Sequence, residues 1–167
     1  MAKLVVMCGV PGSGKSHFSH ALESKIGNRV YVVTSDVLRE KFGGSPQNFN
    51  NEQLVWKTFY ELAREYSKDK QGVVILDATY LTVYYRTVAT DCLKNLYDYK
   101  CLVAFELDKN LVYLQNSNRT WPVPLDVLKH MFKKYERPGV EDAKFYNDIF
   151  YVRDHNIDHL IDEIIKK

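Results

Sequence analysis

Short hydrophobic runs alternate along this chain with longer segments whose hydrophobic positions recur with helical spacing. The short runs contain many β-branched and aromatic residues and therefore predict strands. They are Leu4–Cys8, Val30–Thr34, Val73–Leu76, Lys100–Glu106 and Ile149–Val152. The longer segments predict helices at Ser16–Ile26, Asp36–Phe42, Asn51–Asp69, Thr82–Leu96, Lys109–Ser117, Leu125–Tyr135 and Ile157–Ile165. This alternation favours an α/β fold in which helices cover a parallel sheet of about five strands.

The composition agrees with a globular domain. The chain has 167 residues, of which 26% are charged and 46% hydrophobic, and its length predicts a single domain over residues 1–167. The net charge of +2 is too small to indicate a nucleic-acid partner by itself. The cysteines show no metal or disulfide spacing, and no run approaches the ~20 apolar residues of a membrane span. We therefore expect a soluble, cytoplasmic protein without a membrane partner.

One glycine-rich segment carries the strongest chemical signal. It matches the phosphate-binding pattern G-x-x-x-x-G-K-[ST] and consists of Gly9, Val10, Pro11, Gly12, Ser13, Gly14, Lys15 and Ser16. It lies between a predicted strand and a predicted helix, where backbone N–H groups and the helix dipole favour phosphate oxygens. Lys15 is expected to reach the β- and γ-phosphates of ATP, and the Ser16 hydroxyl to bind Mg²⁺. The predicted fold thus becomes a three-layer αβα P-loop NTPase with ATP and Mg²⁺ as ligands.

Charged residues follow two other predicted strands, at the edge where such folds bind ligands. Asp36 and Arg39 come after the second strand and share one helix face. Asp36 is a candidate general base for an acceptor hydroxyl, and Arg39 a candidate two-pronged ligand for an acceptor phosphate or carboxylate. The alternative is that Asp36 caps the helix and Arg39 is solvated. Asp77 ends the third strand, where we expect it to support Mg²⁺ or the acceptor, and Arg86 is expected to reach the acceptor or to pair with a surface carboxylate.

Residues 109–138 have the features of a helical lid. Arg119 stands near the end of a predicted helix, before Trp121-Pro122-Val123-Pro124. A lid arginine there stabilises charge on a phosphoryl group during transfer; the alternative is a favourable contact with the helix dipole. The next helix is basic, which indicates either a contact with a phosphate backbone or a solvated face. Its cations are Lys129, His130, Lys133, Lys134 and, just beyond it, Arg137.

Taken in order, these motifs resemble the polynucleotide 5′-hydroxyl kinase family of phage and bacterial nucleic-acid repair. The resemblance rests on Gly9–Ser16, Ser35-Asp36-x-x-Arg39, Leu76-Asp77-Ala-Thr79, the Asn-x-x-Arg that ends at Arg119, Val123-Pro124, Met131 and Glu136-Arg137-Pro138. It implies that the γ-phosphate of ATP is transferred to the 5′-hydroxyl of DNA or RNA. By this resemblance Asp36 is the general base and Arg39 binds a 3′-phosphate of the acceptor. The implied phosphoryl and metal ligands are Lys15, Arg119 and Ser16, with Asp77 supporting the metal or acceptor site.

Two positions depart from that family and leave the acceptor open. Tyr80 stands where the family often has asparagine, and Trp121 and Pro122 occupy the place of a second lid arginine. The alternative is a related kinase that acts on a nucleoside, a tRNA-linked group or a small-molecule hydroxyl. A regulatory ATPase without a phosphoryl acceptor is the third interpretation, and it is disfavoured because it needs no Asp36–Arg39 pair facing the phosphates.

Overall fold

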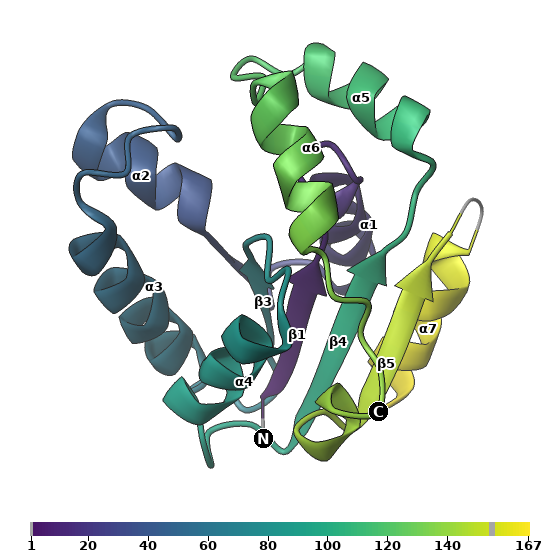
Figure 1. Ribbon diagram of the computed structural model, residues 1–167. Coiled ribbons are helices and arrows are strands. Elements are labelled where there is room, and N and C mark those ends of the chain that lie inside the picture. Colours follow the sequence, from purple (N-terminus) through teal and green to yellow (C-terminus); the bar gives the residue numbers. More distant parts are fainter. Residues whose placement is uncertain (1, 154–155) are drawn as a thin grey trace.

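A computed structural model describes residues 2–153 and 156–167 (Figure 1). Within these residues five strands form one parallel sheet in the order β2-β3-β1-β4-β5. The strands are β1 Lys3–Cys8, β2 Val30–Thr34, β3 Val73–Asp77, β4 Tyr99–Phe105 and β5 Asp148–Val152. Each predicted strand is confirmed, with its ends displaced by at most one residue.

Helices cover both faces of this sheet (Figure 1). They are α1 Lys15–Ile26, α2 Ser35–Gly43, α3 Glu52–Tyr66, α4 Val83–Cys92, α5 Lys109–Ser117, α6 Leu125–Lys134 and α7 Ile157–Lys166, with a short 3-10 helix at Asp142–Lys144. On one face α1 and α7 pack against strand residues such as Val5. On the other face, α3 and α4 pack against the alternate strand residues, such as Leu4. Because both faces of the sheet are covered, β1 is apolar from Leu4 to Cys8, and the predicted three-layer αβα fold is confirmed.

The segment from residue 109 to residue 138, called the lid segment below, lies beyond the carboxyl ends of the strands and contains α5 and α6 (Figure 1). A small hydrophobic cluster holds its inner side, and its buried members are Val10, Leu81, Val112 and Leu128. Val10 belongs to the glycine-rich loop and Leu81 follows β3. The cluster therefore fixes the lid segment over the predicted phosphate site.

Two predicted helices end earlier than expected, and a third has a different capping residue. The helix predicted over Asn51–Asp69 ends at Tyr66, and the one predicted over Thr82–Leu96 ends at Cys92, because the residues that follow form tight turns. The third difference concerns α2, which begins at Ser35 directly after β2, so that the capping position falls on Thr34. The alternative in which Asp36 caps the helix is therefore wrong. Asp36 lies in the first turn of α2 instead.

The parallel register brings the ends of three strands to one level. Met7 of β1 and Thr34 of β2 both pair with Asp77 of β3. The glycine-rich loop after β1 and the start of α2 after β2 therefore meet beside Asp77, at the edge where α/β folds bind ligands. Among the described residues, none of the helices has the length and apolar character that would be needed to cross a bilayer.

Candidate active site

The glycine-rich loop has the backbone geometry that a phosphate cradle needs. Gly12 and Gly14 have φ angles of 80° and 99°, which a residue with a Cβ atom rarely adopts. A Cβ atom on Gly12 would also lie 3.0 Å from backbone atoms of Val112 and Asn116 in α5. Within the described part of the chain, the buried hydroxyl of Ser13 has no hydrogen-bond partner. A glycine-bent loop with an unpaired buried hydroxyl fits a bound anion, so these residues fit a triphosphate.

Lys15 is the first residue of α1, and its ammonium group lies against the loop. Its Nζ donates to the carbonyl oxygens of Gly9 and Val10, at 3.0 and 3.2 Å. Burial lowers the pKa of Lys15, while the carboxylates of Asp77 and Asp36 oppose that shift. Phosphate oxygens are stronger, charge-assisted acceptors than peptide carbonyls. The lysine is therefore placed to exchange these carbonyls for the phosphates of a nucleotide.

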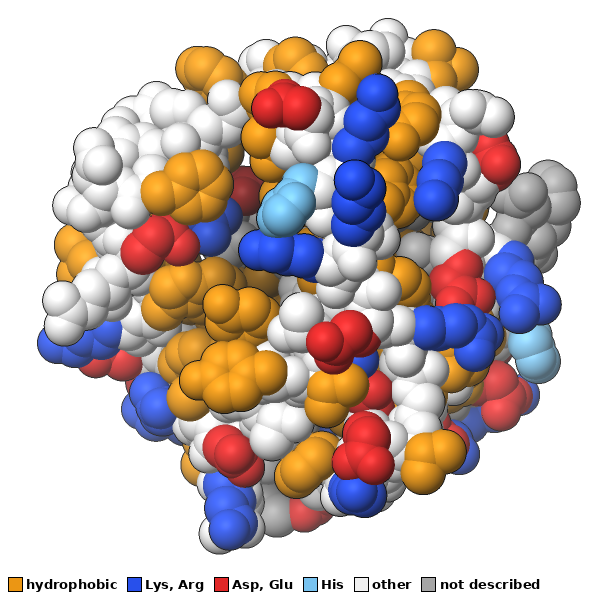
Figure 2. All heavy atoms as spheres, viewed as in Figure 1, with side chains coloured by type: hydrophobic (Ala, Val, Ile, Leu, Met, Phe, Trp, Pro, Cys, Tyr) orange, Lys and Arg blue, Asp and Glu red, His pale blue; other side chains and the backbone are white. Residues whose placement is uncertain are grey.

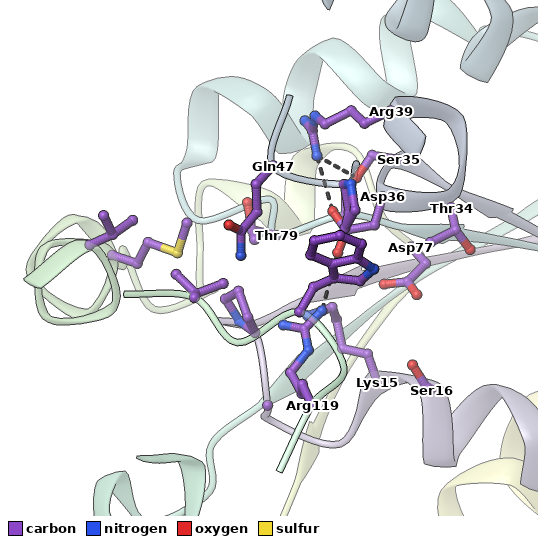
Figure 3. Close-up of a pocket in the computed structure, with 18 of the residues that line it drawn as sticks. Lys15, Ser16, Thr34, Ser35, Asp36, Arg39, Gln47, Asp77, Thr79 and Arg119 are labelled. Atoms are coloured by element: carbon purple, nitrogen blue, oxygen red, sulfur yellow. Dashed lines mark hydrogen bonds and ion pairs between the residues drawn. The ribbon is translucent and has the colours of Figure 1, made fainter. Parts of the chain in front are cut away.

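Asp77 and Ser16 border the same cleft as Lys15 (Figure 3). Asp77 is only 9% exposed, and burial raises the pKa of its carboxyl while Lys15 opposes the shift. Ser16 is exposed. A hydroxyl and a carboxylate are hard oxygen ligands of the kind that Mg²⁺ accepts beside nucleotide phosphates. These residues therefore fit the metal, which neutralises phosphate charge when it is bound.

Asp36 stands between two arginines in the cleft (Figure 3). Its Oδ1 accepts a hydrogen bond from Arg39 Nη1 at 3.1 Å, and its Oδ2 accepts one from Arg119 Nη2 at 3.2 Å. Arg39 is a neighbour on α2, whereas Arg119 comes from the lid segment, 83 positions further along the chain. The structure thus brings the predicted base and the predicted lid arginine into direct contact. The side chain of Asp36 remains 43% exposed, which leaves it accessible to an acceptor.

The guanidinium group of Arg39 already has a two-pronged partner. It donates to the carboxylate of Glu52 in α3, from Nε at 2.7 Å and from Nη2 at 3.1 Å. Trp56 Nε1 donates to the same carboxylate at 2.9 Å. The centre of the Phe49 ring lies 4.8 Å from the guanidinium carbon, and the Arg39 side chain is only 11% exposed. Glu52 therefore makes the contact that the sequence assigned to an acceptor phosphate.

One cleft with a volume of about 670 Å³ is lined by Lys15, Ser16, Asp36, Arg39, Asp77 and Arg119. Its lining also includes glycines of the glycine-rich loop and the aromatic side chains of Phe49, Trp56 and Trp121. Gln47 Nε2 donates to the carbonyl of Pro122 at 2.9 Å, so the loop between α2 and α3 is joined to the lid segment. The volume lies within the range of small-molecule sites and exceeds what a phosphate group alone would need.

The turn that carries Arg119 is fixed from inside the lid segment. The side-chain amide of Asn116 donates to the carbonyl of Val123 at 2.8 Å and accepts from its N–H at 3.0 Å. Asn116 is buried, and its backbone nitrogen also borders Gly12 of the glycine-rich loop. The position of Arg119 is therefore coupled through Asn116 to the phosphate end of the cleft.

Arg86 does not reach the cleft, and the expectation that it binds the acceptor is wrong. It is fully buried and donates two hydrogen bonds to the carboxylate of Asp142, at 2.6 and 3.0 Å. Its Nη1 donates to the carbonyl of Tyr80 at 3.0 Å, a residue held at a φ of 42°. One residue earlier, the carbonyl of Thr79 accepts from Gly9 N at 3.0 Å. Arg86 thus supports the turn after β3, which is hydrogen-bonded to the glycine-rich loop.

Sequence reasoning did not single out Glu52, Trp56 or Gln47. The available signal was weak, because residues four positions apart lie on the same helix face whatever their function. Only the packing of α3 beside α2 shows that Glu52 faces Arg39. Gln47 lies between the predicted helices Asp36–Phe42 and Asn51–Asp69, in a stretch whose sequence gives no indication of a partner.

Fold and site together define a P-loop kinase: the glycine-rich loop stands between β1 and α1, and a helical lid segment lies over the strand ends. Within that class the chain belongs to the AAA_33 family, whose model bears the description "AAA domain" and matches residues 4–138. The match includes the glycine-rich loop, Asp36, Asp77 and the lid segment. P-loop kinases bind ATP with Mg²⁺, in agreement with the ligands predicted for this loop.

Two curated proteins show related sequences. The chain is 26% identical over 180 residues to the L-seryl-tRNA(Sec) kinase of Methanococcus maripaludis, a match that covers 98% of this chain and 65% of that protein. It is 25% identical over 148 residues to protein kti12 of Schizosaccharomyces pombe, covering 81% of this chain and 52% of that protein. The chain therefore spans between half and two thirds of the length of these curated relatives.

Solved structures share the fold at lower identity. Kti12 of Chaetomium thermophilum in complex with ADP-AlF3 has a TM-score of 0.74 at 16% identity, over 98% of this chain and 97% of that one. The APS kinase CysC of Mycobacterium tuberculosis, with AMPPNP and APS, has a TM-score of 0.59 at 19% identity, over 99% and 96%. The Pnkp1/Rnl/Hen1 complex has a TM-score of 0.59 at 23% identity, over 72% and 40%. These likenesses support the P-loop kinase fold but do not single out the polynucleotide 5′-kinase subtype that the motifs resemble.

Proposed function

We propose that this chain transfers the γ-phosphate of ATP to a hydroxyl group on a tRNA-linked acceptor, with Asp36 as the general base. The observation that carries the proposal is the position of the Asp36 carboxylate. It follows β2, lines the cleft that begins at the glycine-rich loop, and lies 3.2 Å from Arg119 of the lid segment. A carboxylate in this position is suited to accept a proton from a hydroxyl that attacks the γ-phosphate.

The proposed reaction is an in-line displacement. The acceptor oxygen forms a bond to the γ-phosphorus, the bond from that phosphorus to the bridging oxygen of ADP breaks, and the hydroxyl proton passes to Asp36. Lys15 and Arg119 would stabilise charge on the transferring group, and Ser16 and Asp77 would hold Mg²⁺. For this, Arg119 would have to leave Asp36 and bind the phosphoryl group. The proposed role of the lid segment is to carry Arg119 between these two partners.

Two observations support a tRNA-linked hydroxyl as the acceptor. The relative from Methanococcus maripaludis, named for its action on L-seryl-tRNA(Sec), matches 98% of this chain. In addition, Glu52 occupies both arms of Arg39, so the cleft offers no open fork for a phosphate beside the reacting hydroxyl. A 5′-hydroxyl polynucleotide end is the second candidate. The Asp36-x-x-Arg39 motif and the likeness to the Pnkp1/Rnl/Hen1 complex favour it.

A panel of acceptors tests the proposal. Transfer of ³²P from [γ-³²P]ATP would be measured with seryl-tRNA, the same tRNA without its amino acid, 5′-hydroxyl RNA and DNA oligonucleotides, and free serine. We expect label on the aminoacyl group and none with Asp36→Asn. Label at the 5′-end of plain oligonucleotides would favour the second candidate. ATP hydrolysis without labelling of any acceptor would support the regulatory ATPase instead.

A further inference from the structure

We infer that the outward face of α6, together with Tyr84 and Tyr85, is a surface for single-stranded RNA that leads into the cleft. The inference rests on the proposed function, since it names where the single-stranded end that carries the acceptor would lie. The basic face of α6 is defined here as Lys129, His130, Lys133 and Lys134.

The helix α6 has two distinct sides. Leu128 is fully buried, and Met131 and Phe132 pack beside it in the cluster under the lid segment. The four residues of the basic face are all exposed on the opposite side. A helix anchored on one side in this way presents its other side rigidly, which lowers the entropic penalty of ordering its side chains on a ligand.

The cations of the basic face lack carboxylate partners. Elsewhere in the chain, exposed lysines such as Lys25, Lys68 and Lys144 form ion pairs with carboxylates. Within residues 2–153 and 156–167, no salt bridge involves the basic face, even though Asp126 lies three positions before Lys129. A solvated helix face more often pairs opposite charges at this spacing. The positive charge of α6 is thus left available to an anionic partner.

The basic face begins at the mouth of the cleft. Val127 and Met131 of α6 line the cleft. His130 follows Val127 by three positions and Lys134 follows Met131 by three, so these two cations are neighbours of cleft-lining residues on the helix surface. Figure 2 shows the blue and pale-blue side chains gathered over α6 beside the hollow of the cleft. An anionic chain bound along α6 would therefore enter the site near Asp36.

Two exposed aromatic rings extend this surface. Tyr84 and Tyr85, in the first turn of α4, are 70% and 59% exposed, and their ring centres lie 5.3 Å apart. Glu136, just after α6, links the end of that helix to the start of α4. Its N–H donates to the carbonyl of Leu81 at 2.8 Å, and its carboxylate accepts from Val83 N at 2.7 Å. Exposed aromatic rings beside unpaired cations are the combination that binds single-stranded nucleic acid, because bases stack on the rings while phosphates meet the cations.

One predicted cation does not belong to this surface. Arg137 donates to the carboxylate of Glu106 at 2.5 Å, and its guanidinium carbon lies 4.2 Å from the centre of the Tyr151 ring. The surface is therefore limited to α6 and the start of α4. With ten residues, α6 is about 15 Å long, which restricts the contact to a few nucleotides.

Binding of a fluorescein-labelled single-stranded RNA, followed by fluorescence anisotropy at several salt concentrations, tests the charged part. For Lys129→Glu/Lys133→Glu we expect at least a tenfold weaker affinity. The slope of the logarithm of the binding constant against the logarithm of the salt concentration should fall in magnitude by about two, roughly one for each lost phosphate contact. Lys129→Arg/Lys133→Arg should bind like the wild type. The matched control is Lys57→Glu/Lys94→Glu, which reverses two exposed lysines outside the surface. Equal weakening in that control, or none in α6, would overturn the inference.

The aromatic part has its own matched pair. Tyr84→Ala/Tyr85→Ala should weaken RNA binding by about fivefold or more, whereas Tyr84→Phe/Tyr85→Phe retains both rings and should not. Because these binding measurements need no phosphoryl transfer, failure of the RNA surface can be distinguished from failure of the proposed function. RNA binding that depends on α6, without transfer to any hydroxyl, supports the surface and contradicts the proposed function. Transfer to an RNA-linked hydroxyl that is unaffected by both sets of variants supports the function and overturns the surface.

Discussion

The carboxylate of Asp36 accepts a hydrogen bond from the guanidinium group of Arg119, which approaches it from the lid segment at 3.2 Å. The proposed base and the proposed phosphoryl ligand are therefore paired with each other. Their side chains are 43% and 30% exposed, so solvent weakens the pair, and its contribution to stability is expected to be no more than about 1 kcal/mol. An incoming acceptor and γ-phosphate would have little free energy to overcome in separating them.

Replacement of Asp36 by asparagine should separate chemistry from ATP binding. Asparagine keeps the shape of the side chain and removes its basicity, so we expect kcat for phosphoryl transfer to fall by about 10²–10⁴-fold. The Kd for ATP, measured by isothermal titration calorimetry, should change little, because Asp36 lies outside the glycine-rich loop. A parallel loss of ATP affinity would contradict the general-base assignment.

Replacement of Arg119 by methionine should affect the transition state more than the folded state. If Arg119 stabilises the transferring phosphoryl group, kcat should fall by roughly 10³-fold or more, as for other arginines in this position. The thermal midpoint should hardly move, because the pair with Asp36 is solvated. Stopped-flow or quench-flow transfer assays and calorimetry measure the two effects. A destabilised protein with unchanged kcat would show that Arg119 has a structural role only.

Glu52→Gln should change which acceptors the cleft accepts. The substitution removes the charge that neutralises Arg39 while keeping a side chain of similar size. Asp36 would then be the remaining carboxylate on the largely buried guanidinium group. This excess of positive charge favours an anionic ligand, so the ratio of kcat/KM for a 3′-phosphorylated nucleoside to that for the unphosphorylated one should rise about tenfold. Glu61→Gln, at an exposed position of the same helix, is the matched control. An unchanged ratio in Glu52→Gln would show that Glu52 does not govern the acceptor.

The same residue makes a prediction about acid stability. Burial tends to raise the pKa of Glu52, but the hydrogen bond and the charge of Arg39 outweigh it and hold the pKa below 4.5. A depressed pKa contributes stability that is present above the unfolded value and is lost as the pH falls through the folded value. Between about pH 6 and pH 3, the free energy of unfolding in urea should therefore decrease less for Glu52→Gln than for the wild type. An identical pH dependence of the two proteins would contradict this expectation.

Arg86→Met should be strongly destabilising. It leaves the carboxylate of Asp142 buried without its cation, and breaking such a pair typically reduces stability by about 3–5 kcal/mol. The double variant Arg86→Met/Asp142→Leu removes both charges and should recover part of the loss. Urea denaturation monitored by tryptophan fluorescence measures both. A loss below about 1 kcal/mol in Arg86→Met would show that the pair is not needed to hold the turn after β3.

The sequence by itself determined the elements that depend on near neighbours. Apolar runs and helical spacing located the strands to within one residue, because burial on both sheet faces leaves no polar positions inside β1 and β3. The order of strands and helices then required a parallel sheet. The glycine-rich loop was equally readable, since its positive φ angles and close contacts demand glycine at fixed positions. Asp36 and Asp77 could be placed because parallel strands end at a common edge.

Only the tertiary structure decided the partners of the charged side chains. Arg39 meets Glu52, Arg119 meets Asp36 and Arg86 meets Asp142, pairs that lie 13, 83 and 56 positions apart. Such contacts depend on how helices pack beside one another and over the strand ends, and no local periodicity records that packing. The sequence thus indicated a phosphate site with a carboxylate beside it, while the packing of the helices decided which arginines line the cleft and which is buried in the core.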